Sequence, residues 1–402
     1  MAQLRLKLLD PHRASLEKCV YCPKLSRAAC PVSNVEANEA VTPWGKMSMA
    51  YFAARGDVPI DAEHAAPAWA CSACYACRER CDHRNEVSTV LADARADFFA
   101  RGVAPPAAEA AAHRFRERSE DLRRAVETLE EGRERGAGAR DPQRARGASE
   151  RAPAVVLLGC GYVRHAPEVA REALDAVEAL TGAPARVVRA CCGLPLLYAG
   201  DRRGFEEAAR RLSAEVREAL GDGRGARGAS RGRSTNAGAG ASDARFIAVD
   251  PGCARAVLAE YPRVQVEAPR PELFVDVAFG ALDRLERSAS TRRVRYHDPC
   301  QLGRGLDRYD EPRAILARIT GRSPEEFIHQ REHADCSGGG GLVPVTRPES
   351  SAAIADRRIE EHRGLGGGLL VTHCAQSLRR FRSRGEAVED LVSLVARAAR
   401  PG

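Results

Sequence analysis

The feature that most constrains this chain is a run of four cysteines with short, regular spacing. Cys71, Cys74, Cys77 and Cys81 follow the pattern C-x2-C-x2-C-x3-C. Thiolates at this spacing can wrap the corners of an iron–sulfur cubane, while the fourth reaches a neighbouring cluster. Zinc needs only four ligands in two pairs, so three closely spaced cysteines before a fourth favour iron. The spacing therefore predicts a ferredoxin-type [4Fe–4S] motif.

A second cysteine group precedes this motif. Cys19, Cys22 and Cys30 are followed by Pro31, and Ser26 stands where a further cysteine would be expected. In the crossed arrangement of two-cluster ferredoxins, each cluster takes ligands from both groups. The first set would be Cys30, Cys71, Cys74 and Cys77, and the second would be Cys19, Cys22 and Cys81. A hydroxyl is a poorer iron ligand than a thiolate. We therefore expect one complete [4Fe–4S] cluster, and a second that is [3Fe–4S], serine-ligated, labile or absent. The alternative for Ser26 is a surface hydroxyl beside an empty site.

The chain has 14 cysteines in 402 residues, and its first ten residues contain no secretion signal. Metal or redox chemistry is therefore favoured over a disulfide framework, and we expect a cytoplasmic protein without a membrane span. Two Arg-rich stretches supply most of the net charge of +7: 132–152 has six Arg against three acidic residues, and 221–244 has four against two. The remainder is nearly neutral, so no nucleic-acid partner is expected.

The C-terminal two thirds of the chain alternate between strand-like and helix-like patterns. Short apolar runs occur at 154–158, 186–188, 246–249, 294–296, 327–328 and 369–372, and helical patterns at 167–180, 204–220, 312–320, 348–362 and 387–399. Such alternation predicts α/β layers with a mostly parallel sheet. Before them we expect a helix at 107–131 and a linker at 132–152, rich in Gly and Arg.

The cysteines of this part form an internal repeat. The first unit has Cys160, Cys191, Cys192 and Cys253, and the second has Cys300, Cys336 and Cys374. The first unit is longer by the stretch 221–244, which we interpret as a disordered insert. The predicted divisions are a ferredoxin-type domain at 1–103, a helix and linker at 104–152, and cysteine-rich domains at 153–286 and 287–402.

Several of these cysteines follow predicted strands. Ligands at the carboxyl ends of neighbouring parallel strands converge on one crevice, so the four thiols of the first unit could hold a further cluster. Inert buried thiols are the alternative, and it applies more strongly to the three cysteines of the second unit. The glycine run 338–341 lacks the P-loop pattern and is not expected to bind phosphate. His297 and His373 lie near cysteines and are expected to support them rather than to bind metal.

Together these motifs resemble the heterodisulfide-reductase-like iron–sulfur proteins, which include iron–sulfur subunits of glycolate, lactate and anaerobic glycerol-3-phosphate oxidation systems. The segments that carry the resemblance are CVYCPKLSRAACP, CSACYACRERC, CCG at 191–193, DPGC at 250–253, HDPCQLGRG at 297–305, CSGGGGL at 336–342 and VTHC at 371–374. The resemblance implies an α-helical two-cluster ferredoxin domain followed by two repeated α/β cysteine-rich domains. In the heterodisulfide reductase branch, five cysteines of such a unit can hold a noncubane cluster that reduces disulfides.

This chain departs from that pattern at several positions. Asp250, Ser337 and Val371 stand where the family has cysteines, and Asp82 stands where a proline often follows. Because these cysteines are missing, we do not expect the chain itself to reduce heterodisulfides at a noncubane cluster. We therefore expect an electron-transfer subunit of an oxidoreductase complex, whose partner is a flavoprotein dehydrogenase or another redox subunit, which could itself be bound to the membrane. Two alternatives are thiol–disulfide reduction at the first cysteine-rich unit and a zinc-containing protein that binds nucleic acid.

Overall fold

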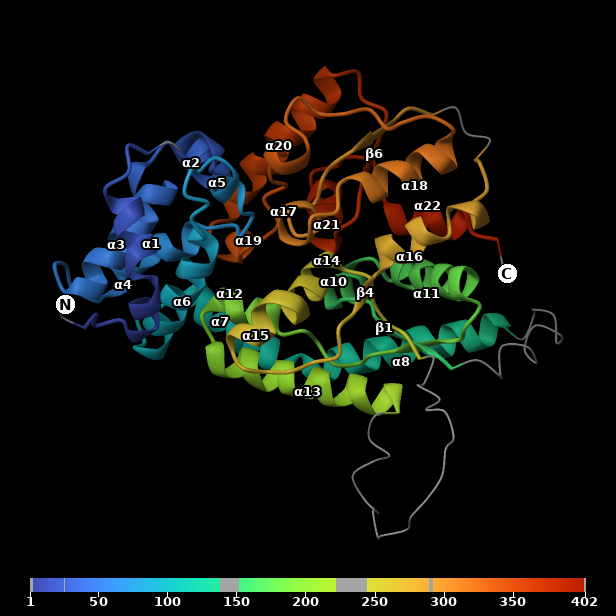
Figure 1. Cartoon of the computed structure of the whole chain (residues 1–402), viewed down its shortest axis with the longest axis horizontal. Coiled ribbons are helices and arrows are strands. Elements are labelled where there is room, and N and C mark those ends of the chain that lie inside the picture. Colours follow the sequence, from blue (N-terminus) through green and yellow to red (C-terminus); the bar gives the residue numbers. More distant parts are fainter. Residues whose placement is uncertain (1–2, 25, 138–151, 222–243, 289–291, 401–402) are drawn as a thin grey trace, which may run out of the picture.

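The computed structural model describes residues 3–24, 26–137, 152–221, 244–288 and 292–400. A helical N-terminal region, drawn in blue, lies beside two α/β units drawn in green to yellow and in orange to red (Figure 1). All of the insert predicted at 221–244 except its two end residues, and most of the linker predicted at 132–152, lie outside the described residues. The boundaries predicted between the domains stay predictions.

The N-terminal region consists of short helices around an apolar core of its own. Its longest helices are α3 (Pro43–Arg55) and α6 (Val87–Ala100). Thr42 caps α3 by accepting a hydrogen bond from the Gly45 amide at 3.0 Å, and Gly56 ends it at a φ of +87°. The other elements are η1 (Lys7–His12), α1 (Arg13–Val20), η2 (Arg27–Ala29), α2 (Pro31–Glu36), η3 (Glu39–Val41), α4 (Ala62–Ala65), η4 (Ala66–Ala70) and α5 (Ala76–Glu79).

Two helices, not one, connect this region to the first α/β unit. They are α7 (Pro106–Glu117) and α8 (Ser119–Ala137), so the predicted helix at 107–131 is broken near Arg118 and extends past its predicted end. Leu122, Val126 and Leu129 are buried at helical spacing in the core of the α/β units. This apolar stripe anchors α8.

The first unit contains a four-stranded parallel sheet in the order β2-β1-β3-β4. The strands are β1 (Ala154–Leu157), β2 (Ala185–Val187), β3 (Phe246–Ala248) and β4 (Glu272–Leu273), of which β4 was not expected. The helical elements are α10 (Cys160–His165), α11 (Pro167–Thr181), α12 (Leu194–Ala199), α13 (Arg202–Leu220), α14 (Pro251–Arg255), η7 (Ala256–Glu260), α15 (Tyr261–Arg263), α16 (Phe274–Gly280) and η8 (Leu282–Arg284). The parallel α/β arrangement confirms the fold class.

The second unit contains a three-stranded parallel sheet in the order β5-β6-β7. Its strands are β5 (Val294–Tyr296), β6 (Leu369–Thr372) and β7 (Val388–Asp390). Its helical elements are α17 (Gly303–Leu306), α18 (Asp310–Thr320), η9 (Arg331–His333), α19 (Val343–Thr346), α20 (Pro348–Gly364), α21 (Ala375–Ser383) and α22 (Leu391–Ala398).

Two expectations for this unit were wrong. The predicted strand at 327–328 is absent, because the apolar Phe327 packs in the core and does not pair with a strand. The nearby backbone pairing is an isolated bridge between Arg295 and Glu325. The predicted helix at 387–399 begins later, at Leu391. Its first residues pair with β6 as β7 instead.

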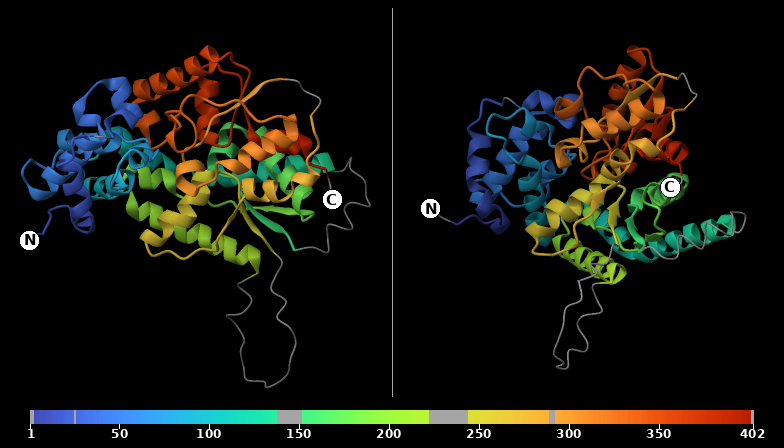
Figure 2. Two further views of the ribbon diagram at one scale, coloured as in Figure 1. Left: turned by 45° about the horizontal axis from the view of Figure 1, so that its top comes forward. Right: turned by 45° about the vertical axis from the view of Figure 1, so that its right-hand side comes forward.

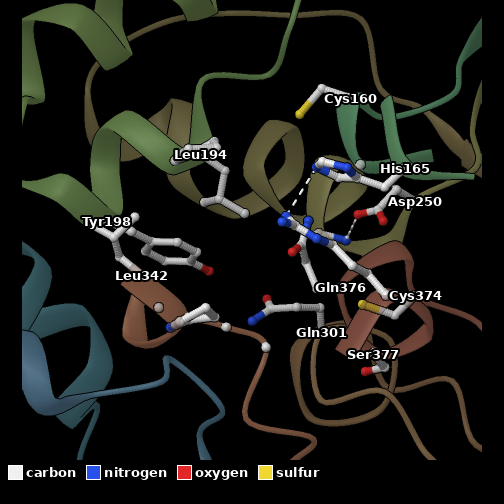
Figure 3. A pocket seen from close by; sticks show the side chains of 18 of the residues that line it. Cys160, His165, Leu194, Tyr198, Asp250, Gln301, Leu342, Cys374, Gln376 and Ser377 are labelled. Carbon is white, nitrogen blue, oxygen red and sulfur yellow. Dashed lines mark hydrogen bonds between the residues drawn. The ribbon is translucent and has the colours of Figure 1, made fainter. Parts of the chain in front are cut away.

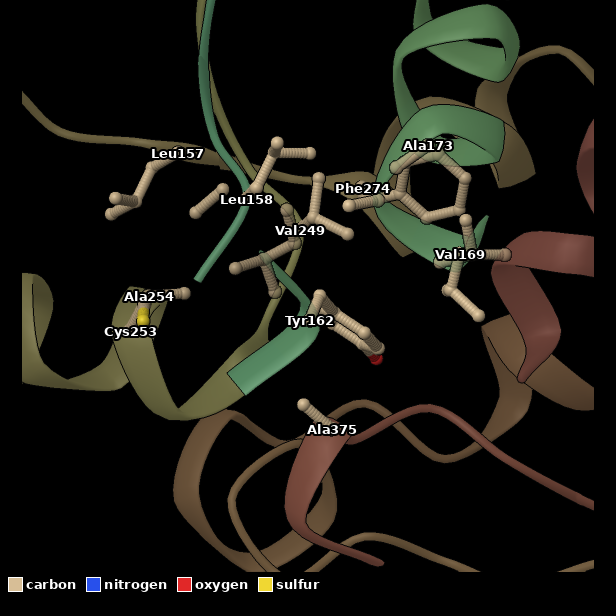
Figure 4. Close-up of a cluster of buried hydrophobic side chains, with 14 of the residues drawn as sticks. Leu157, Leu158, Tyr162, Val169, Ala173, Val249, Cys253, Ala254, Phe274 and Ala375 are labelled. Atoms are coloured by element: carbon tan, nitrogen blue, oxygen red, sulfur yellow. The ribbon is translucent and has the colours of Figure 1, made fainter. Parts of the chain in front are cut away.

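The two units share one continuous apolar core. Helix α11 of the first packs against α22 of the second, and the Tyr162 hydroxyl donates a hydrogen bond to Asp390 at 2.7 Å. Figure 4 shows Tyr162 from the first unit close to Ala375 from the second. A Cβ on Gly161 would lie 2.7 Å from the Cβ of Ala375, so glycine permits this close approach. Both views of Figure 2 show the units side by side, with the N-terminal region against both.

Candidate iron–sulfur and cysteine sites

The first predicted cysteine set surrounds one cavity in the N-terminal region. Cys30, Cys71, Cys74 and Cys77 all line it, together with Lys46. The loop that carries three of these thiols turns through left-handed backbone conformations at Ala73 and Tyr75, which bends the short segment around the cavity. Each of the 14 cysteines lies in the described residues and is a free thiol. The structure therefore brings the predicted set together, while its role as a ligand set stays a prediction.

Lys46 is a residue of this site that the sequence reasoning missed. Its side chain is 2% exposed, and Nζ donates a hydrogen bond to Cys30 Sγ at 3.2 Å. Burial opposes the charge, but the nearby thiolates of Cys30, Cys71 and Cys77 raise the pKa of Lys46 overall. A buried cation that faces sulfur is a group that can stabilise a negatively charged centre. Lys46 is the last lysine of an Arg-rich chain, which could have drawn attention to it.

The three thiols of the second predicted set, Cys19, Cys22 and Cys81, also lie close together. Burial raises the pKa of Cys19 to about 12, and the neighbouring thiolates of Cys22 and Cys81 add to the effect. Ser26 directly precedes the short helix η2 and is partly exposed. Its assignment as a ligand stays a prediction.

The four cysteines of the first α/β unit form a connected cluster. Cys191 lies beside both Cys160 and Cys192, and the Sγ atoms of Cys192 and Cys253 lie 3.3 Å apart. A hydrogen bond from Cys192 lowers the pKa of Cys253, but burial and the Asp250 carboxylate raise it to about 12. Buried thiols with raised pKa values ionise only beside a compensating positive centre. This all-sulfur donor set therefore fits iron–sulfur chemistry.

Asp250, which stands where the family has a cysteine, accepts hydrogen bonds from backbone amides. Its carboxylate accepts hydrogen bonds from the amides of Gly252 at 2.8 Å and Cys253 at 3.3 Å, and so caps α14. The other oxygen accepts from the Ala375 amide at 3.2 Å, across the boundary between the two units. The substitution exchanges a thiol for a carboxylate that positions the Cys253 turn.

Two cysteines of the second unit lie against the N-terminal region. Cys336 lies beside Cys74, and Cys300 packs in the same small cluster. The Cys336 thiol and the Arg304 guanidinium lower the pKa of Cys74, while burial opposes them. Cys374 lies near Asp250. Burial raises the pKa of Cys374, and the negative charge of Asp250 raises it further. The sequence repeat therefore predicts which cysteines of the two units are equivalent, but it does not predict which cysteines lie close together in space.

The two histidines noted beside cysteines have structural partners. Burial lowers the pKa of His297, which contacts the rings of Phe327 and Phe381. His373 Nδ1 lies 3.2 Å from Asp390. Neither histidine lies among the residues that line the cavity around Cys71.

Three buried side chains hold the carbonyl groups of the 71–74 loop. Arg95 donates to the Cys71 carbonyl at 2.7 Å, Gln301 to Ala73 at 2.9 Å, and Arg304 to Cys74 at 2.6 Å. Gln301 and Arg304 belong to the second unit, so that unit directly positions the cysteine loop. A buried arginine inside the apolar stretch 87–100 was the signal that could have revealed Arg95.

The glycine run 338–341 provides close backbone packing rather than a phosphate site. A Cβ on Gly340 would lie 2.4 Å from the Ser72 carbonyl oxygen, and one on Gly341 would lie 2.2 Å from the Cys71 carbonyl oxygen. No real side chain fits at these distances. The run therefore allows the second unit to lie directly against the cysteine loop.

The donor chemistry of these sites fits clusters better than single ions. Within the described residues, no three His, Cys, Asp or Glu side chains are arranged to hold one metal ion. Thiolates that bind a multi-iron cluster attach to its separate corners, as the spread of four thiols around the cavity near Cys71 would allow. Lys46 beside them matches a negatively charged group.

A larger chamber of about 320 Å³ lies between the two α/β units. Cys160, Cys192 and Cys253 face it from the first unit, and Cys300, Cys336 and Cys374 from the second. Figure 3 shows Cys160 at the top of it and Cys374 at the lower right, with Tyr198 at the left and Gln301 below. Thiols from both units therefore share one small-molecule-sized space.

Across the part of the chain that the structure describes, no helix combines the length and apolar character needed to cross a membrane.

Comparison with protein families assigns most of these sites to two kinds of domain. Residues 15–85 match the 4Fe-4S dicluster domain, and residues 154–223 and 294–377 each match the cysteine-rich domain. The first match spans both cysteine sets of the N-terminal region. The match at 154–223 includes β1, β2 and Cys160, Cys191 and Cys192, and the match at 294–377 includes β5, β6 and the three cysteines of the second unit.

The chain is also similar to components of known reductases. It is 26% identical over 219 residues to a subunit of the dihydromethanophenazine:CoB–CoM heterodisulfide reductase of Methanosarcina barkeri, covering 52% of this chain and 49% of the relative. It is 33% identical over 129 residues to a subunit of the fumarate reductase (CoM/CoB) of Methanothermobacter marburgensis, covering 32% of this chain and 26% of the relative. The chain thus spans about half or less of the length of these relatives.

The domain matches, the relatives and the cysteine geometry agree. The chain contains a 4Fe-4S dicluster domain followed by two cysteine-rich domains, and its relatives are heterodisulfide reductase subunits and related iron–sulfur proteins.

Proposed function

We propose that this chain is the iron–sulfur electron-transfer subunit of an oxidoreductase complex. The observation that supports this most directly is the contact between Cys74 of the dicluster domain and Cys336 of the second cysteine-rich unit. Through that contact, the cavity lined by Cys30, Cys71 and Cys77 adjoins the chamber between the two units. Electrons would thus have a continuous route from the dicluster domain to a small-molecule-sized space.

The residues named above suit this role. Clusters bound by these thiolates would supply one-electron transfer. Lys46 donates a hydrogen bond to Cys30, and Arg304 holds the Cys74 carbonyl. Hydrogen bonds and charges at the sulfur ligands set reduction potentials. These two side chains would therefore tune the first cluster.

We assign the clusters as follows. A complete [4Fe–4S] cluster would be held by Cys30, Cys71, Cys74 and Cys77. The second set has three thiols, which would hold a [3Fe–4S] or incomplete cluster. The four thiols of the first cysteine-rich unit would hold a further one. The partner would be a flavoprotein or another redox subunit, because the chain shows no flavin-binding fingerprint of its own.

Anaerobic purification with iron and sulfide assays, followed by an EPR-monitored redox titration, tests this proposal. We expect a coloured protein with at least two separate EPR signals. A folded, iron-free protein would contradict the proposal, and zinc in place of iron would favour the zinc-containing alternative.

The chamber also favours a second candidate function, thiol–disulfide reduction at the first cysteine-rich unit. Three of the four clustered thiols, Cys160, Cys192 and Cys253, face a space large enough for a small disulfide. The assay supplies reduced viologen together with small heterodisulfides. Consumption of viologen that depends on the disulfide, and that is lost in Cys192→Ser, would support this function. The absence of turnover in a protein with intact clusters would leave electron transfer to a partner as the function.

A further inference from the structure

Tyr75 is a buried aromatic residue inside the cysteine loop. It follows Cys74 directly and precedes Cys77 by two residues. Tyr75 is 3% exposed, and its backbone has a left-handed conformation with a φ of +61°. Residues other than glycine rarely adopt this conformation unless the surrounding structure holds them there. The contacts of the Tyr75 ring therefore help to fix the shape of the loop.

The main contact of this ring comes from the first cysteine-rich unit. The guanidinium carbon of Arg255 lies 4.4 Å from the centroid of the Tyr75 ring, and that of Arg78 lies 5.2 Å from it. An aromatic face attracts a guanidinium, and more strongly where water is excluded. Arg255 is 7% exposed and follows Cys253 by two residues. The contact therefore joins the loop of the first cluster to the turn that carries Cys253.

A short π-helix fixes the position of Arg255. Helix η7 follows Arg255 directly, and its wide turn allows side chains five residues apart to meet. Arg255 Nη1 donates a hydrogen bond to Glu260 Oε1 at 2.6 Å. Because Glu260 is also buried, its carboxylate balances the charge of Arg255 where water does not. Such π-turns are frequent at functional sites.

The neighbours of this ion pair come from all three domains. Glu260 also accepts a hydrogen bond from Arg263, which donates to Asp93 of the dicluster domain at 2.8 Å. From the second unit, α17 packs closely: a Cβ on Gly305 would lie 2.7 Å from the Cδ atom of Arg255. Arg255 thus has little freedom to leave the Tyr75 ring.

The contact between Cys74 and Cys336 does not provide this connection. Cys336 belongs to the second unit, and both Cys336 and Cys253 face the chamber of about 320 Å³. By contrast, Tyr75 is bonded to Cys74, and Arg255 is joined to Cys253 through one residue. The step from ring to guanidinium is the one non-covalent step of this series. Electrons tunnel more readily through packed atoms than across an open space.

We propose that Tyr75 and Arg255 form the electron-transfer bridge between the first cluster and the thiol cluster of the first cysteine-rich unit. One electron leaves the reduced cluster beside Cys74 and enters an oxidised cluster beside Cys253, and neither bridge residue changes its redox state. Arg255 is a positioning residue, which holds the Tyr75 ring between the two sites. The inference rests on the proposed function for the presence of both clusters.

Rapid freeze-quench EPR of the iron-loaded chain tests the bridge. Reduced methyl viologen is added in substoichiometric amount, so that electrons redistribute between the clusters after the viologen is consumed. In the wild-type chain we expect the signals of the two clusters to reach their final ratio in a separate phase. Arg255→Met and Tyr75→Leu should slow this phase about tenfold or more. Tyr75→Phe keeps the ring under the guanidinium and should retain the wild-type rate.

A similar arginine–tyrosine pair outside the bridge provides the matched control. Arg55, at the exposed end of α3, lies 5.4 Å from the centroid of the Tyr51 ring, and Arg55→Met should leave the rate unchanged. Iron and sulfide assays and urea unfolding show which variants keep their clusters and their fold. If Arg255→Met loses its clusters, Arg255→Lys keeps a cation beside Glu260 but lacks the planar group, and it should still be slower than the wild type.

The outcomes separate this proposal from the proposed function. Wild-type rates in Tyr75→Leu and in the Arg255 variants would overturn the bridge and leave the proposed function standing. Equal slowing in Tyr75→Phe and Tyr75→Leu, or in Arg255→Met and Arg55→Met, would do the same. The absence of the clusters, or of any redistribution between them, in the wild-type chain would overturn both proposals.

Discussion

Buried cations lie beside the cysteines and face sulfur or carbonyl groups instead of carboxylates. Lys46 and Arg95 are each 2% exposed, and Arg304 is 5% exposed. Burying a charge without a partner is costly. These cations are therefore best explained by the negative charge of thiolates and by the carbonyl groups of the cysteine loop.

Replacing Lys46 should change the potential of the first cluster. Lys46→Met removes a positive charge beside Cys30, so the reduced cluster, which carries one more negative charge, loses stabilisation. We expect a more negative midpoint potential, by roughly 50–100 mV on a Coulomb estimate. An EPR-monitored titration measures it. The control is Lys24→Met, because Lys24 pairs with the exposed Glu39; equal shifts in both variants would refute a local effect.

Ser26 can be tested by supplying the missing thiol. We expect Ser26→Cys to raise iron per chain or to convert a [3Fe–4S] EPR signal into a [4Fe–4S] signal, because thiolate is the better iron ligand. Ser383→Cys, which adds a thiol on the exposed end of α21, is the matched control. No change in iron or in EPR would show that Ser26 does not occupy a ligand position.

At the scale of elements, short segments that contain glycine or cysteine position the cysteine sites. Strands β1 and β6 end just before Cys160 and Cys374, whose helices α10 and α21 contact each other. The glycine run before α19 lies against the Cys71 loop. The cysteine sites are thus assembled where elements of different domains meet.

Alanine substitutions at two glycines with nearly the same backbone conformation distinguish the cost of backbone strain from the cost of a steric clash. Gly341 has a φ of +61°, and an added Cβ would lie 2.2 Å from the Cys71 carbonyl oxygen; Gly367 has a φ of +62° and open space around it. We expect Gly341→Ala to cost about 2 kcal/mol more than Gly367→Ala in urea unfolding. Similar losses in the two variants would mean that the second unit does not pack closely on this loop.

At the scale of the whole molecule, one guanidinium joins all three domains. Arg95 donates to Ala68 at 2.9 Å and Cys71 at 2.7 Å in its own domain, and to Tyr198 and Gly341 at 3.1 Å in the two cysteine-rich units. The relative position of the domains, and with it the contact between Cys74 and Cys336, depends on such contacts.

Removing Arg95 should loosen this arrangement. Arg95→Met leaves four carbonyl groups without their donor, and we expect a loss of about 3 kcal/mol in unfolding free energy. We also expect slower electron transfer from the dicluster domain to a chamber-bound acceptor, measured by stopped flow. Arg203→Met, on an exposed face, should change neither. An unchanged transfer rate in a destabilised Arg95 variant would show that the arginine supports folding alone.

Spacing along the chain was enough to predict sites whose ligands are close in sequence. The set built on Cys71, Cys74 and Cys77 could be assigned because three thiols within seven residues have few ways to be arranged around a cluster. The consecutive apolar residues of β1 likewise indicated a buried strand. By contrast, Phe327 resembled part of a strand because burial in a core and burial in a sheet select the same side chain.

The sequence by itself determined the cysteine groups, the repeat and the parallel α/β class, because these follow from local spacing and periodicity. Only the tertiary structure decided that Cys336 meets Cys74, that Lys46 faces Cys30, and that Arg255 lies over the ring of Tyr75. These contacts join residues far apart along the chain, and they depend on how the domains pack. That packing is set by many weak interactions spread over several helices, which no local pattern encodes.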